Sequence, residues 1–175
     1  MTSLAELMVQ LQAAPEQNDC WGQFVNELDQ SDHGVGLHLA VFVEPYLRFI
    51  LEGRKTIESR FSLKPLAPYS LVAVGDVLLL KRAGGPVQGV CRVANVWSYR
   101  LDPKTWNMIR RDFADEISPA DEQFWRERES AKYATLMRVT EVRSMPSLSV
   151  RKRDRRGWVV LKSSSHGRES LWNWS

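Results

Sequence analysis

Apolar and polar residues alternate over short stretches in the middle of this chain, and glycine, proline or aspartate residues separate the stretches. A period of two is typical of half-buried β-strands. Alternating stretches, together with mostly apolar runs at 77–81 and 157–161, predict strands over residues 37–43, 56–61, 77–81, 87–97, 136–145 and 157–161. The turn-forming run between the third and fourth of these predicts a β-hairpin.

Apolar residues at helical spacing appear between these strands. They predict a helix over 44–52, with Pro45 at its first position and Gly53 just past its end. Asp102 and Pro103 open a second predicted helix, and Ser118 and Pro119 open a third. We expect the second and third helices to form an insertion, residues 102–132, within a domain that spans residues 37–162.

The two ends of the chain differ from this domain. Residues 1–36 contain two apolar helical stripes, six acidic residues and no lysine or arginine. We therefore expect an acidic, helical N-terminal extension. Residues 163–175 form a polar tail that contains Trp172 and Trp174. The domain between them is more basic than the net charge of +3 suggests, and a basic surface favours partners that carry phosphate.

Composition limits the class of protein further. The 175 residues are 43% hydrophobic and 26% charged, as in soluble globular domains. No apolar run approaches the ~18 residues of a membrane span, so no membrane partner is expected. Two cysteines and no signal peptide predict a cytoplasmic protein without a disulfide framework. The three histidines are scattered and no Cys-x-x-Cys pair occurs, so neither a metal site nor a cofactor is expected.

Residues 53–61, Gly-Arg-Lys-Thr-Ile-Glu-Ser-Arg-Phe, concentrate the reactive side chains. In an extended strand Thr56, Glu58 and Arg60 share one face, whereas Lys55 and Ser59 start on the core face. Burial lowers the pKa of a lysine, so Lys55 is a candidate general base or nucleophile, or a charged anchor for phosphate. Glu58 either pairs with the neighbouring cations or positions a water molecule and accepts a proton.

Four features in this order resemble the ASCH domain family, relatives of the PUA RNA-binding domains. They are the helix at 44–52, the run Gly53-x-Lys55-x-x-Glu58-x-Arg60, the Gly75-Asp76 turn into a strand, and the strand around Gly89. The resemblance covers roughly residues 38–161. It implies an α+β fold, a small PUA-like β-barrel of five or six strands decorated by helices, with a cleft lined by the lysine strand.

The same resemblance implies RNA or nucleotide ligands. Some family members look like amidohydrolases of N4-acylated cytidine, and some have been proposed as ribonucleases. The amidohydrolase members carry a threonine three residues after the lysine, where this chain has Glu58. Residues at other strand ends would line the cleft too. The candidate ligand-binding residues are Thr56, Arg60, Lys81, Arg82, Tyr99, Tyr133 and Thr135.

Two of these expectations have a simpler alternative. Each tyrosine either stacks on an unpaired base or packs against apolar side chains with its hydroxyl in water. A basic run either contacts nucleic-acid phosphates or is a solvated loop. Its five cations are Arg151, Lys152, Arg153, Arg155 and Arg156.

The sequence leaves three functions open. The leading one is a module that binds RNA or a modified nucleoside or nucleotide. The second is a small hydrolase, an amidohydrolase or ribonuclease, with Lys55, Glu58 and Ser59 as catalytic residues. The third is a protein-interaction module that uses the N-terminal helices and the tryptophans of the tail. Whether the chain is an enzyme, and whether it forms a homodimer, is not decided by the sequence.

Overall fold

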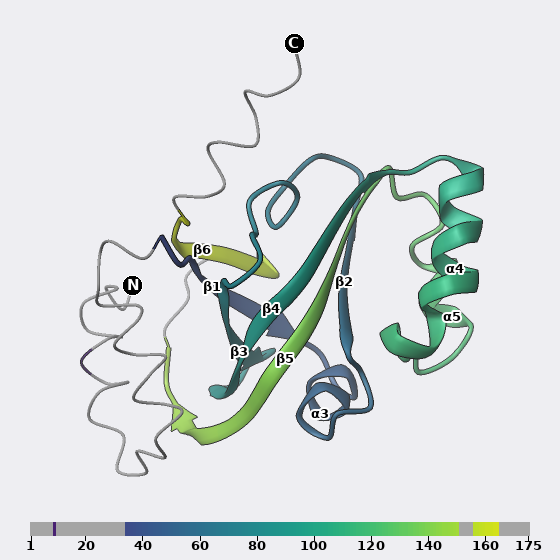
Figure 1. Cartoon of the computed structure of the whole chain (residues 1–175). Helices are drawn as coiled ribbons and strands as arrows, with labels where there is room; N and C mark the ends of the chain where they lie inside the picture. The colour runs from purple at the N-terminus through teal and green to yellow at the C-terminus, as the bar shows by residue number, and fades with distance from the viewer. Residues whose placement is uncertain (1–8, 10–33, 151–155, 165–175) are drawn as a thin grey trace.

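The computed structural model describes residues 9, 34–150 and 156–164, in which one curled sheet carries helices at one side (Figure 1). In chain order the elements are β1 (Leu37–Phe42), α3 (Tyr46–Leu51), β2 (Ile57–Ser62), β3 (Val77–Arg82), β4 (Val87–Arg100), α4 (Pro103–Ile117), α5 (Gln123–Arg126), β5 (Tyr133–Leu148) and β6 (Trp158–Lys162). No helix in these residues is long and apolar enough to cross a membrane.

The six strands form one sheet in the order β2-β5-β4-β3-β1-β6. β1 and β3 are parallel, and the other neighbours are antiparallel. The sheet curls into a half-barrel whose two edge strands are β2 and β6. This architecture is the predicted α+β, PUA-like fold.

β4 and β5 extend well beyond the predicted strands. They pair with each other from Val87 opposite Leu148 to Arg100 opposite Tyr133. Register shifts interrupt this ladder at three places in β4: between Val87 and Gly89, between Val90 and Arg92, and between Val93 and Asn95. Unequal numbers of residues face each other at these shifts, and a one-residue bulge moves the following side chains to the other face of the sheet.

Two predicted helix starts are wrong. Pro45 lies one residue before the first helical residue of α3 rather than inside the helix. Ser118 ends α4 in a left-handed conformation, with φ of 50°, and the next helix, α5, begins only at Gln123. Asp102 does cap α4, because its side chain accepts a hydrogen bond from the Thr105 amide at 2.7 Å.

In the described residues the hydrophobic core has three clusters: one inside the curl, one beneath the inserted helices, and one formed by side chains of β1, β3 and β4. α3 buries Leu47 and Ile50 against the concave side of the sheet. α4 and α5 pack on Ile57 of β2 and on the start of β5. The start of β2 is therefore held between two cores, and the residues that precede it lie at the junction of α3, α4 and the sheet.

A fully buried polar network also ties several elements together. Trp158 Nε1 donates to His38 Nδ1 at 3.2 Å. An indole nitrogen is only a donor, so the proton of neutral His38 is on Nε2, 2.9 Å from Asp76 Oδ2. The Asp76 carboxylate also accepts from the Gly36 and Ala73 amides at 2.8 Å. The network fixes β6 to β1 and anchors the loop that precedes β3.

Candidate ligand-binding site

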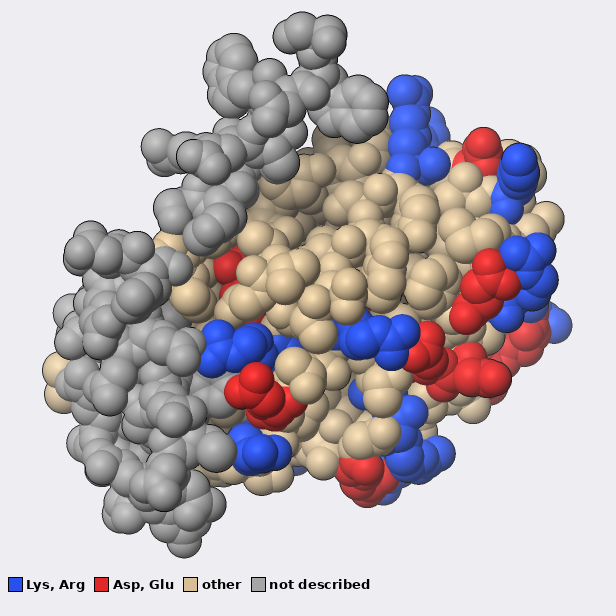
Figure 2. All heavy atoms as spheres, viewed as in Figure 1, with Lys and Arg blue, Asp and Glu red and all other residues tan. Residues whose placement is uncertain are grey.

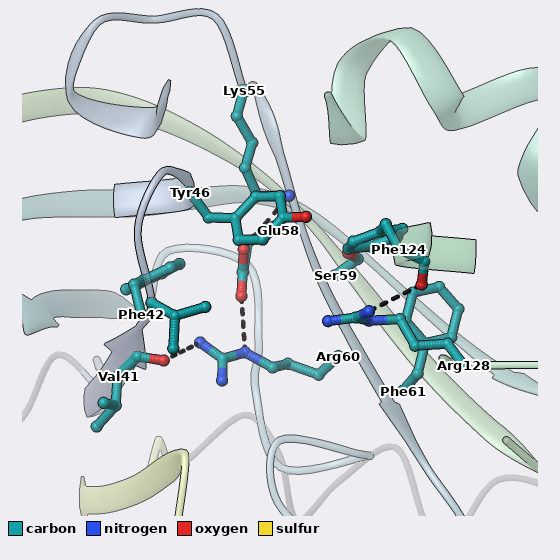
Figure 3. A pocket seen from close by; sticks show the side chains of 11 residues that line it. Val41, Phe42, Tyr46, Lys55, Glu58, Ser59, Arg60, Phe61, Phe124 and Arg128 are labelled. Carbon is teal, nitrogen blue, oxygen red and sulfur yellow. Dashed lines mark hydrogen bonds and ion pairs between the residues drawn. The ribbon is translucent and has the colours of Figure 1, made fainter. Parts of the chain in front are cut away.

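A cavity of about 200 Å³ lies where the start of β2 meets the end of β1, α3 and α5 (Figure 3). Four aromatic rings line it, those of Phe42, Tyr46, Phe61 and Phe124. The Phe124 centroid is 5.6 Å from that of Tyr46 and 6.2 Å from that of Phe61. Its charged lining residues are Lys55, Glu58, Arg60 and Arg128. The exposed lining of the cavity is more polar than apolar, and its polar groups converge between aromatic rings, as specificity-giving groups do in small-ligand sites.

Lys55 lies at the inner end of this cavity and is only 2% exposed. Its Nζ donates to Ile57 O at 2.7 Å and to Ile117 O at 2.9 Å, and lies 3.5 Å from Glu58 Oε2. Burial lowers the pKa of Lys55, and the nearby Glu58 carboxylate opposes that shift. β2 begins at Ile57, so Lys55 lies two residues before the strand and is buried there.

Glu58 joins Lys55 to Arg60. Glu58 is 4% exposed. Its Oε1 lies 2.7 Å from Arg60 Nε, so the two side chains form a close ion pair, although the geometry at Nε is not that of a hydrogen bond. The predicted Glu58–Arg60 pair is therefore confirmed. Each carboxylate oxygen faces one cation, which holds Glu58 in place at the inner wall of the cavity.

Arg60 also spans the opening of the half-barrel. From edge strand β2, its Nη2 donates to Val41 O at 2.9 Å and its Nη1 to Gly157 O at 3.1 Å. The guanidinium lies 5.1 Å from the ring of Phe42 and 5.3 Å from that of Trp158, within range of cation–π attraction. One side chain thus connects β2 to β1 and to the residue before β6.

Two further side chains complete the site. The Ser59 hydroxyl is buried and has no hydrogen-bond partner among the described residues. Arg128 lies over the Phe124 ring at 3.9 Å and donates from Nη1 to Phe124 O at 2.8 Å. Tyr46, Phe124 and Arg128 were not among the predicted site residues. Phe124 and Arg128 were missed because nothing in the sequence indicates that the insertion reaches the lysine strand.

The structure places the other candidate residues outside this cavity. The backbone of Thr56 forms hydrogen bonds with the backbones of Glu116 and Val139. Lys81 Nζ donates a hydrogen bond to Gly85 O in the hairpin turn. Arg82 is exposed beside that turn. Tyr99 packs against the core beneath α4, and Tyr133 contacts Tyr69 with ring centroids 5.0 Å apart. These contacts are those of the packing alternative for both tyrosines.

The remaining candidates lie near or beyond a second cavity. Thr135 is buried opposite Arg60 and lines this larger cavity, together with the exposed Arg156. The other four cations of the basic run, residues 151–155, lie outside the described residues, as do the tail tryptophans and nearly all of the N-terminal extension.

The curled sheet, its inserted helices and the charged cavity at the opening define a PUA-like α+β domain. Comparison with solved structures shows which known fold the domain is similar to. The crystal structure of ASCH from Zymomonas mobilis superposes with a TM-score of 0.58 and 14% identity, covering 77% of this chain and 92% of that chain. Two variants of that protein each superpose with a TM-score of 0.57 and 14% identity, covering 77% of this chain. The match covers 95% of the tyrosine-to-phenylalanine variant and 93% of the serine-to-alanine variant.

The chain therefore has an ASCH-type fold. No family model matches the sequence, and no curated protein matches it.

Proposed function

We propose that this protein binds a nucleotide-like ligand whose base enters the cavity beside Glu58. The observation that carries this proposal is a buried, doubly paired carboxylate at the inner wall of an aromatic-lined cavity of about 200 Å³. Aromatic faces hold unpaired bases by stacking, and a carboxylate accepts hydrogen bonds from the amino group of a base.

Hydrogen-bonding capacity remains at this wall. A carboxylate offers about four acceptor positions, and Lys55 and Arg60 occupy one on each oxygen of Glu58. The Ser59 hydroxyl can both donate and accept. A buried polar group without a protein partner is uncommon and often marks a functional position, which supports Ser59 as a ligand contact.

The geometry favours binding over hydrolysis by Lys55. Three oxygens surround Nζ, those of Ile57, Ile117 and Glu58, and they match the three N–H donors of an ammonium group. A general base or nucleophile instead needs a free electron pair directed at the substrate. We therefore assign Lys55 as a positioning residue that orients Glu58.

The test is a calorimetric titration of the full chain with the four common ribonucleosides, their monophosphates and a short single-stranded RNA. Val43 lines the cavity and is 58% exposed, so Val43→Glu places a carboxylate at its mouth without disturbing the core. We expect saturable binding by at least one of these ligands, weakened about tenfold or more by this variant.

Leu63→Glu is the matched control, because Leu63 is 60% exposed and lies away from the cavity. It should bind as the wild type does. No saturable binding, or equal weakening by both variants, would overturn the proposal. Mass spectrometry of the same mixtures, with N4-acylated cytidines included, tests hydrolysis. A product formed by the wild type and lost in Lys55→Met would instead assign the hydrolase function.

A further inference from the structure

A second cavity, of about 530 Å³, lies between the two edges of the half-barrel. We call it the β2–β6 cleft. Its walls are the end of β2, the loop between β2 and β3, and the start of β6. Arg60 and Phe61 line both this cleft and the smaller cavity. The volume is in the usual range for sites that hold organic ligands.

The walls of the cleft are mainly apolar. Leu66, Leu71, Trp158 and Val160 contribute to them. Leu66 and Leu71 are 62% and 51% exposed, although both belong to a loop that is otherwise anchored through Asp76. Figure 2 shows an uncharged area in the upper middle of the molecule, whereas many charged side chains gather on the side that carries α4 and α5. An apolar surface of this kind on a fixed loop indicates a binding site.

The charges that line the cleft have one sign. Its charged lining residues are Arg60 and Arg156, and none of the described residues that line it is acidic. Both arginines have other interactions, among them the ion pair of Arg60 with Glu58, and both line the cleft. Such a hollow attracts anions, because low-dielectric walls focus the electrostatic potential.

The edge strand β6 adds hydrogen-bonding groups. The Val41 amide donates to Gly157 O at 2.9 Å, and the antiparallel register continues from there with Ala40 opposite Trp158 and His38 opposite Val160. Paired and unpaired positions alternate along an antiparallel ladder. The peptide groups of Trp158 and Val160 therefore point away from β1, toward the open edge and the cleft that both residues line.

We propose that the β2–β6 cleft is a second ligand site, specific for a small organic anion with an aromatic or aliphatic body. The apolar body lies between the loop leucines and Trp158. The anionic group lies toward Arg60 and Arg156, and the peptide groups of the β6 edge donate hydrogen bonds to its polar atoms. The site is independent of the nucleotide-like ligand proposed above.

The test uses a fluorescent probe with these two parts, anilinonaphthalene sulfonate, and its uncharged parent phenylnaphthylamine. Both are titrated into the full-length folded chain. We expect one sulfonate probe per chain and at least about tenfold weaker binding of the uncharged parent. Leu71→Glu places a carboxylate in the cleft and should weaken the sulfonate probe about tenfold or more, while the far-ultraviolet circular dichroism stays unchanged.

Two variants on exposed positions give the comparison. Leu63→Glu adds the same charge to the same loop outside the cleft, and it should leave the affinity unchanged. Val43→Glu alters the smaller cavity instead. Equal affinity for the two probes, equal effects of Leu71→Glu and Leu63→Glu, or a loss on Val43→Glu without a loss on Leu71→Glu would each overturn the assignment.

Discussion

The substitution Glu58→Gln tests whether the Lys55–Glu58–Arg60 cluster is organised by the buried carboxylate. Glutamine keeps the shape of the side chain but removes the charge between two cations. Breaking one partner of a buried ion pair costs about 3–5 kcal/mol, because a buried charge loses its compensation. Here each cation keeps two backbone carbonyls, those of Ile57 and Ile117 for Lys55 and those of Val41 and Gly157 for Arg60. We therefore expect the lower end of this range, about 3 kcal/mol.

Urea unfolding at neutral pH, followed by tryptophan fluorescence and by circular dichroism, measures this loss. Glu122→Gln is the matched control, because Glu122 pairs with Arg110 at 2.6 Å while both side chains are well exposed. An exposed pair contributes about 0–1 kcal/mol, so this variant should lie close to the wild type. If Glu58→Gln and Glu122→Gln lose the same free energy of unfolding within about 0.5 kcal/mol, the buried carboxylate does not organise the cluster.

Two other substitutions test the buried polar groups. Burial lowers the pKa of Lys55, so between this lowered value and the ordinary lysine value the unfolded chain binds more protons than the folded one. The wild type should therefore gain stability relative to Lys55→Met as pH rises from 7 toward 10, measured by urea unfolding at each pH. In Asp76→Asn the amide oxygen can keep the hydrogen bonds from His38 and Ala73, so the NH₂ group faces the Gly36 amide. Leaving that one donor unsatisfied costs about 1–3 kcal/mol, which urea unfolding measures.

Each of these substitutions has an exposed counterpart. Lys104→Met removes a lysine from the solvent face of α4, and its stability relative to the wild type should not change over the same pH interval. A parallel change in both lysine variants would contradict the buried-charge explanation. Asp102→Asn preserves a helix cap, since asparagine caps about as well as aspartate. If Asp76→Asn is no less stable than Asp102→Asn, the network does not anchor β6 and the loop.

Local patterns in the sequence predicted most of the strands and the start of α4. Alternation and short apolar runs bounded by turn residues marked the strands, and Asp102 with Pro103 marked the helix, because each of these signals acts over a few residues. The last residues of β5, 146–148, were missed where register shifts interrupt its alternation, whereas the missed end of β4 and start of β5 lie in a regular part of the ladder. A bulge depends on the partner strand, and one sequence does not show which residue will lack a partner.

The candidate site was predictable only in part. The Glu58–Arg60 pair follows from spacing on one strand, and the structure has it. The position of Lys55 depends on where β2 begins, which is set by packing between α3 and α4 rather than by alternation. Phe124 and Arg128 reach the cavity through an insertion more than 60 residues along the chain from β2. Contacts between residues so far apart in the sequence form only in the tertiary structure, and neither local propensity nor periodicity predicts them.

Arg60 connects the architecture of this half-barrel to both of its cavities. A fully closed barrel would pair β2 with β6 through backbone hydrogen bonds, and no cleft would remain between them. Here the guanidinium makes the connection instead, with bonds to Val41 O and Gly157 O on one side and the Glu58 carboxylate on the other. A side chain can span a gap that backbone groups cannot, so the opening stays wide enough for two hollows. The same opening leaves the β6 edge unpaired, which is why the fold and its candidate sites have a common physical origin.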